Sequence, residues 1–196
     1  MKLKKVIISS IAFCSLMTIG KVSASIDESK LSSYFPDESL NLCVVKAYNS
    51  AGLSDANYDY EIEDNLSKIT TIECSNKGVT NTKGIGYLTG LKSLNMSRNN
   101  ISTIDLSKNK ELETLDLSQN QLKTLELEKN SKLRSVNLEE NSLSYVHLGN
   151  KYELTDLYLS HNMLEVINLS SATSLSFLDL CYNSISSIDV SKNTEL

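Results

Sequence analysis

The chain has 196 residues, with 19 basic and 24 acidic side chains and a net charge of −5. Residues 1–24 carry four lysines and no acid, so the 172 residues that follow have 15 basic and 24 acidic side chains. An acidic chain of this kind does not favour phosphate backbones or anionic lipid, which argues against nucleic-acid binding and direct membrane binding.

Residues 1–24 predict an export signal. Three lysines in the first five residues form a basic start, a largely apolar run follows, and Val22-Ser23-Ala24 has the small-residue spacing that a signal peptidase recognises. The apolar run is shorter than a membrane span, which favours removal over a retained anchor. The lysine-rich start resembles Gram-positive bacterial signals and predicts a secreted or cell-surface protein without membrane insertion after signal removal.

Residues 25–66 predict an N-terminal cap made of a helix and an acidic loop. The helix begins at Phe35-Pro36-Asp37-Glu38, and its apolar stripe is formed by Leu40, Cys43, Val44 and Ala47. A helix directly before a repeat array would shield the open end of the array's core. The order FPDESLNLCVVKAYN, then a polar stretch, then KGVTNTKGIGYLTGLKSLNMSRN, resembles the N-terminal cap of secreted Gram-positive leucine-rich-repeat proteins. In plan it is similar to the internalins.

Relatives of this cap carry a calcium-like loop after the helix. The residues here that echo its spacing are Asp55, Asn57, Asp59, Ile62 and Glu63. However, Tyr60 takes the tight-turn position that requires Gly, and Leu66 stands where a bidentate Glu should close the site. We therefore expect a solvated acidic loop, with no bound metal and no other cofactor.

Residues 67–90 predict an irregular first coil, and the repeat distance from Ile72 to Leu94 is 22 residues, one more than in the coils that follow. Its apolar positions include Cys74, which could meet Cys43 where the cap helix packs on this coil, and export permits a bond. Two small buried hydrophobic residues are the favoured alternative.

Residues 91–196 contain one 21-residue pattern written five times without an insertion or deletion. Each unit reads L-x-x-L-x-L-x-x-N-x-L-x-x-L-x-L-x-x-N-x-x, so its paired apolar positions share one face of an extended segment. One such unit cannot bury its apolar side alone, and the units must stack into a solenoid. The pattern resembles the leucine-rich repeat family, and the doubled half-motif resembles its short bacterial subclass, the IRREKO type. The resemblance implies a right-handed, strand-dominated superhelix behind the short helical cap.

An Asn recurs after the first apolar pair of every unit. Where the chain turns off the strand its backbone groups point into the core, and a buried amide can donate to them and accept from them. We expect a ladder of buried amides formed by Asn99, Asn120, Asn141, Asn162 and Asn183.

The sequence offers no convergent catalytic groups. His147 and His161 fall on different faces of the solenoid, and Asp116 and Asp179 hold the same repeat position three coils apart. No nucleophile elbow, H-E-x-x-H pair or Gly-rich phosphate loop occurs. We therefore expect neither an enzyme nor a metal site.

The outward strand positions change character along the array. They are small or charged in the first three coils and include aromatic side chains in the last two. Exposed aromatics on a rigid face are typical of recognition anchors, although ordinary packing between neighbouring strands also explains them and is favoured. The candidate ligand-binding residues are Asp156, Tyr158, His161, Phe177, Asp179 and Tyr182.

These features predict a binding module for adhesion or recognition, whose partner is a protein or a surface glycan. Two alternatives stay open, namely the substrate-recognition arm of a larger secreted enzyme and a structural spacer on the cell surface. Leu196 holds the repeat position of Leu175, so a sixth coil would begin there. Without it the interior of the fifth coil would face water, and we expect the 196 residues to be a fragment of a longer polypeptide.

Overall fold

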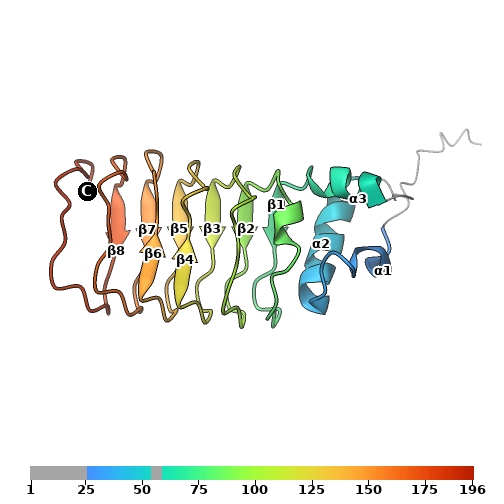
Figure 1. Cartoon of the computed structure of the whole chain (residues 1–196), viewed down its shortest axis with the longest axis horizontal. Helices are drawn as coiled ribbons and strands as arrows, with labels where there is room; N and C mark the ends of the chain where they lie inside the picture. The colour runs from blue at the N-terminus through green and yellow to red at the C-terminus, as the bar shows by residue number, and fades with distance from the viewer. Residues whose placement is uncertain (1–25, 54–58) are drawn as a thin grey trace, which may run out of the picture.

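The computed structural model describes residues 26–53 and 59–196, so the expected export signal lies outside the described residues. Figure 1 shows a row of stacked coils with the helices gathered at its N-terminal end. The expected repeat solenoid with a short helical N-terminal part is confirmed. Within the described ranges, no helix combines the length and the apolar character needed to cross a membrane.

The N-terminal part contains the helices α1 (Glu28–Leu31), α2 (Glu38–Ser50) and α3 (Asp59–Leu66). Asp37 caps α2, because one carboxylate oxygen accepts a hydrogen bond from the Leu40 N–H at 3.0 Å. The other oxygen accepts from the N–H groups of Thr80 and Asn81 at 2.9 and 3.0 Å, which ties the helix to the first coil. Partial burial acts to raise the pKa of Asp37, but these hydrogen bonds together hold it below its ordinary value.

The expected acidic loop is in part a helix, which corrects the sequence reading. Helix α3 carries Ile62 and Leu66 one turn apart, and both side chains are buried. Their spacing gives the segment an apolar face that packs on the core, while Glu63 is exposed. Asp55 and Asn57 of the calcium-like pattern lie outside the described residues.

Cys43 and Cys74 form a disulfide, so the expectation of two reduced cysteines was wrong. Their Cα atoms are 5.6 Å apart, within the range that a disulfide requires. Helix α2 packs against strand β1 (Thr71–Glu73), and this packing brings the two cysteines together. The bond therefore links the cap covalently to the first coil.

Six strands form one parallel sheet, in the order β1, β2 (Ser93–Asn95), β3 (Thr114–Asp116), β5 (Ser135–Asn137), β7 (Asp156–Tyr158) and β8 (Phe177–Asp179). Neighbouring strands pair in the register of the repeat, so that Leu115 lies opposite Val136 and Leu157 opposite Leu178. A second parallel pair, β4 (Thr124–Glu126) and β6 (Tyr145–His147), forms in the second half of two coils. A short 3-10 helix, η1 (Ile85–Tyr87), lies in the first coil.

The apolar repeat positions fill one continuous interior between the two halves of each coil. Leu117, Leu138 and Leu159 are fully buried, whereas Leu180 at the equivalent place in the fifth coil is only partly buried. Ile188 and Val190 of the same coil are 40% and 41% exposed. The core is thus complete through the fourth coil and thinner in the fifth.

Candidate functional site

A ladder of asparagine side chains holds the turn that follows each strand of the six-stranded sheet. The Asn120 amide nitrogen donates to the carbonyls of Met96, Leu117 and Ser118 at 2.9 to 3.2 Å, and its oxygen accepts from the Ile101 N–H at 3.0 Å. Equivalent bonds are made by Asn99, Asn141, Asn162 and Asn183. Each amide thereby joins two coils.

Burial of this ladder is not uniform. Asn99, Asn120 and Asn162 are buried, whereas Asn141 and Asn183 are half-buried. The expectation of full burial is therefore wrong for Asn141 and Asn183, although both amides make hydrogen bonds through their nitrogen and their oxygen.

The residue before each ladder asparagine takes a left-handed backbone conformation. Its φ lies between 52° and 57° at Arg98, Gln119, Glu140, His161 and Tyr182. This conformation turns the chain sharply off the strand, and the side chains at this position form an outward row. His161 and Tyr182 are therefore presented to solvent from a fixed backbone.

In four of the six strands of the large sheet, the last outward residue is an Asn or Asp that closes a local turn. Asn95, Asp116, Asn137 and Asp179 each accept a hydrogen bond from the N–H two residues later, at 2.9 to 3.1 Å. Tyr158 holds this position in β7 and has no oxygen that can reach that N–H. The fourth coil has thus exchanged a turn hydrogen bond for an aromatic ring.

Four of the six candidate residues form two ring pairs across the last two coils. Tyr158 and Phe177 have ring centroids 4.7 Å apart with planes inclined by 34°, and His161 and Tyr182 are stacked at 4.1 Å and 16°. Phe177 is 43% exposed and Tyr182 is 75% exposed. The rings therefore pack against each other between strands and still present much of their surface to solvent.

The two remaining candidates, Asp156 and Asp179, alternate with the rings. Asp156 pairs with Phe177 in the strand register, and Tyr158 pairs with Asp179. Asp156 accepts a hydrogen bond from the Thr155 hydroxyl at 2.6 Å. A hydrogen bond from the neighbouring thiol to Asp179, reinforced by the carboxylate charge, raises the pKa of Cys181. We call these six side chains, Asp156, Tyr158, His161, Phe177, Asp179 and Tyr182, the aromatic patch.

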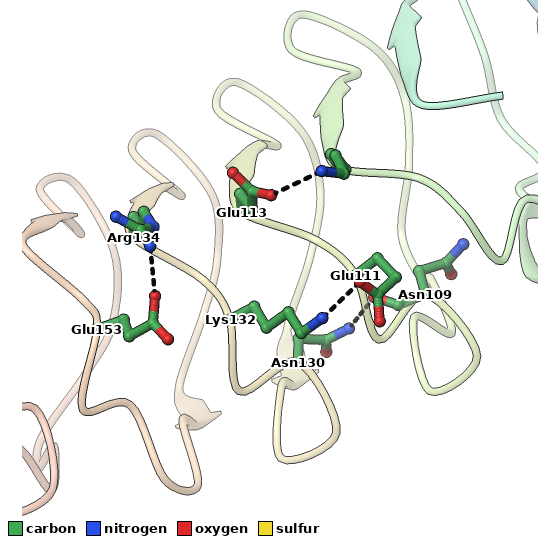
Figure 2. Close-up of polar contacts among 8 residues, drawn as sticks. Asn109, Glu111, Glu113, Asn130, Lys132, Arg134 and Glu153 are labelled. Atoms are coloured by element: carbon green, nitrogen blue, oxygen red, sulfur yellow. Dashed lines mark hydrogen bonds and ion pairs between the residues drawn. The ribbon is translucent and has the colours of Figure 1, made fainter. Parts of the chain in front are cut away.

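Lys132 and Arg134, which precede β5, each form an ion pair (Figure 2). Lys132 contacts Glu111 at 2.5 Å, and Arg134 contacts Glu153 at 2.7 Å. The hydrogen bond between the first two residues lowers the pKa of Glu111 and raises that of Lys132. Both pairs are exposed to solvent, and neither involves a carboxylate of the aromatic patch.

A second ladder runs along the other half of the coils, and the sequence reading missed its irregularity. The Asn130 amide donates to the carbonyls of Leu106 and Asn109 at 2.9 Å. Lys151 holds this position in the next coil, is fully buried, and donates to the Leu127 carbonyl at 2.9 Å. Burial lowers the pKa of Lys151 to about 8. The sequence indicates this irregularity, because Lys151 stands at the position where the repeat has its second Asn.

No group of three or more His, Cys, Asp or Glu side chains within residues 26–53 and 59–196 is arranged to hold a metal ion. His147 pairs with Glu126 at 2.9 Å on the β4–β6 face, whereas His161 lies in the turn after β7.

Comparisons with known proteins agree with this architecture. A family model described as Leucine Rich Repeat matches residues 90–110 and 111–131. Internalin J of Listeria monocytogenes serotype 4b (strain F2365) is 34% identical over 76 residues, which are 39% of this chain and 8% of that protein.

Solved structures extend the likeness to most of the chain. The functional domain of InlJ from Listeria monocytogenes, which includes a cysteine ladder, is 31% identical with a TM-score of 0.77, covering 85% of this chain and 36% of that domain. The leucine-rich repeat domain of APL1B is 26% identical with a TM-score of 0.59, covering 69% of this chain and 40% of that one. The chain thus spans well under two thirds of each of these relatives. By its repeats, its capped solenoid and these matches, the chain is an internalin-like leucine-rich-repeat protein.

Proposed function

We infer that the chain is a secreted or cell-surface module for adhesion or recognition, which binds a protein and has no catalytic activity of its own. Its binding face is the outward surface of the six-stranded sheet, and the aromatic patch on β7 and β8 is the recognition end of that face. The expected export signal supports the location.

The observation that carries this proposal is Tyr158. A turn-closing Asn or Asp occupies its position in β2, β3, β5 and β8, so the tyrosine gives up a hydrogen bond that these four residues make. Residues that break a local structural rule tend to mark functional positions. Exposed rings on a rigid scaffold supply large contact area with little loss of side-chain entropy, which is typical of interface anchors.

A matched pair of variants tests this function. Replacing Tyr158, Phe177 and Tyr182 with Ser should abolish capture of the partner by the immobilised chain, while circular dichroism and the melting temperature stay close to those of the parent. The control replaces Tyr145 and Tyr152, which are exposed elsewhere on the solenoid, with Ser. A protein retained by parent and control but lost from the patch variant supports the proposal, and equal retention by all three contradicts it.

A further inference from the structure

Resting on the binding role inferred above, we propose that the aromatic patch receives a positively charged side chain, Lys or Arg, presented by a protein partner. The argument rests on which chemical groups the strand register sets side by side. Asp156 lies opposite Phe177, and Tyr158 lies opposite Asp179. Rings and carboxylates therefore alternate across two adjacent strands, with each ring next to a negative charge.

Both components attract cations. The face of an aromatic ring carries negative electrostatic potential, and an ammonium or guanidinium group within about 6 Å of the ring centroid is attracted to it. A carboxylate beside the ring adds a charge-assisted hydrogen bond to the same cation. The ring centroids of Tyr158 and Phe177 are 4.7 Å apart, so a single guanidinium can lie within reach of both rings.

The charge of the surrounding surface favours the same occupant. Glu139 and Glu140 follow β5 and hold the repeat positions of Ser160 and His161, and residues 156–162 and 177–183 contain neither Lys nor Arg. Arg134 at the near end of β5 is held by Glu153. No basic side chain of these strands therefore neutralises the patch, and a cation from outside gains the full attraction.

A neutral glycan suits this surface less well. Sugar hydroxyl groups are donors and acceptors at once, and a site for them combines carboxylates with amide or basic donors. The outward positions of β7 and β8 and of the turns after them offer carboxylates, hydroxyls, rings, one imidazole and one thiol, with no amide, Lys or Arg side chain. Nucleic acid is disfavoured by the same negative charge.

The test titrates the full chain, labelled with nitrogen-15, with the peptide acetyl-Gly-Ser-Arg-Ser-Gly-amide and with the same peptide carrying citrulline. Citrulline keeps the shape of arginine and removes its charge. The arginine peptide should shift the amide signals of residues 156–161 and 177–182, with an affinity on the order of millimolar for one exposed contact. The citrulline peptide should bind at least about tenfold more weakly, and the arginine shifts should diminish as salt rises about tenfold.

The variant Asp156→Asn/Asp179→Asn should weaken arginine-peptide binding at least about tenfold. Asn95 and Asn137 fill the repeat position of Asp179 and make its turn hydrogen bond, so the variant keeps the fold. The control Asp116→Asn changes the same repeat position on β3 and should bind like the parent.

Three results would overturn the proposal. Equal binding of the two peptides would show that the face binds without using charge, which leaves the binding role intact. Shifts caused by a neutral oligosaccharide but not by the arginine peptide would identify a glycan surface. The third result is that neither peptide shifts the patch signals although replacement of the three rings abolishes partner binding. In that case the patch binds its partner without a cationic contact.

Discussion

At the scale of single residues, the two ladders differ in how many hydrogen bonds each asparagine completes. In the first ladder both the nitrogen and the oxygen of Asn120 and its counterparts are used. In the second, the side-chain oxygens of Asn109, Asn130 and Asn193 are buried with no hydrogen-bond partner among the described residues. A side chain that only donates therefore loses nothing at this position, which explains how Lys151 is accommodated.

Asn141 tests the first ladder. Replacement with Ala removes a donor to the Leu117 and Leu138 carbonyls and an acceptor for the Leu122 N–H, and should lower the free energy of unfolding by about 1–3 kcal/mol. The control Asn100→Ala, at an exposed position next to a ladder residue, should change little. Chemical denaturation gives both values, and equal midpoints for the two variants would contradict the ladder's role.

Lys151 gives the second ladder a dependence on pH. Its folded pKa of about 8 lies below its ordinary value of 10.5, so folding disfavours the charged form. Between these two pH values the unfolded chain binds one more proton than the folded chain, and the free energy of unfolding therefore rises with pH across this window. At neutral pH the lysine is charged in the folded chain as well, and burying this charge costs on the order of 3 kcal/mol.

The variant Lys151→Asn restores the repeat residue and should lack this rise between pH 8 and pH 10.5. Urea denaturation of parent and variant at several pH values measures the difference. Parallel curves for the two proteins would show that the lysine titrates equally in the folded and unfolded chains.

At the scale of elements, the disulfide fixes the cap to the solenoid. It joins α2 to the coil that contains β1 and closes a loop with a sequence separation of 31 residues. Loop closure of this length restricts the unfolded chain and stabilises the fold by about 3–4 kcal/mol. The double variant Cys43→Ser/Cys74→Ser should lose about this amount in a denaturation experiment, and the parent should lose it on reduction. A double variant as stable as the oxidised parent would contradict this account.

The elements also show where sequence reasoning succeeds and where it stops. The strands and the outward direction of the Tyr158 and Phe177 side chains could be predicted. A fixed 21-residue period sets the strand register and determines which side chains point to solvent. The sequence identified Cys43 and Cys74 as a possible pair but did not predict the bond, because it does not give the 5.6 Å distance between their Cα atoms. Helix α3 was not predicted, because its acidic residues match the spacing of a calcium-like loop and only Ile62 and Leu66 mark its apolar face.

At the scale of the whole molecule, the repeat separates a constant interior from a variable surface. The same Leu and Asn positions hold every coil, so the outward residues can change without disturbing the fold. The sequence could locate the six residues of the aromatic patch, but not the ring pairs that they form. The contacts of His161 with Tyr182 and of Tyr158 with Phe177 depend on side-chain directions that only the structure gives.

The aromatic patch can be labelled chemically, because Cys181, two residues after Asp179, has an exposed thiol. Coupling a bulky maleimide to Cys181 should block binding of the partner protein while leaving the melting temperature unchanged. The control is Cys181→Ser/Ser170→Cys, which carries the same label on the exposed Ser170 position of the other half-coil and should bind like the unlabelled chain. Undiminished binding by the chain labelled at Cys181, or loss of binding only when the label is at position 170, would contradict the assignment of β7 and β8 as the recognition end.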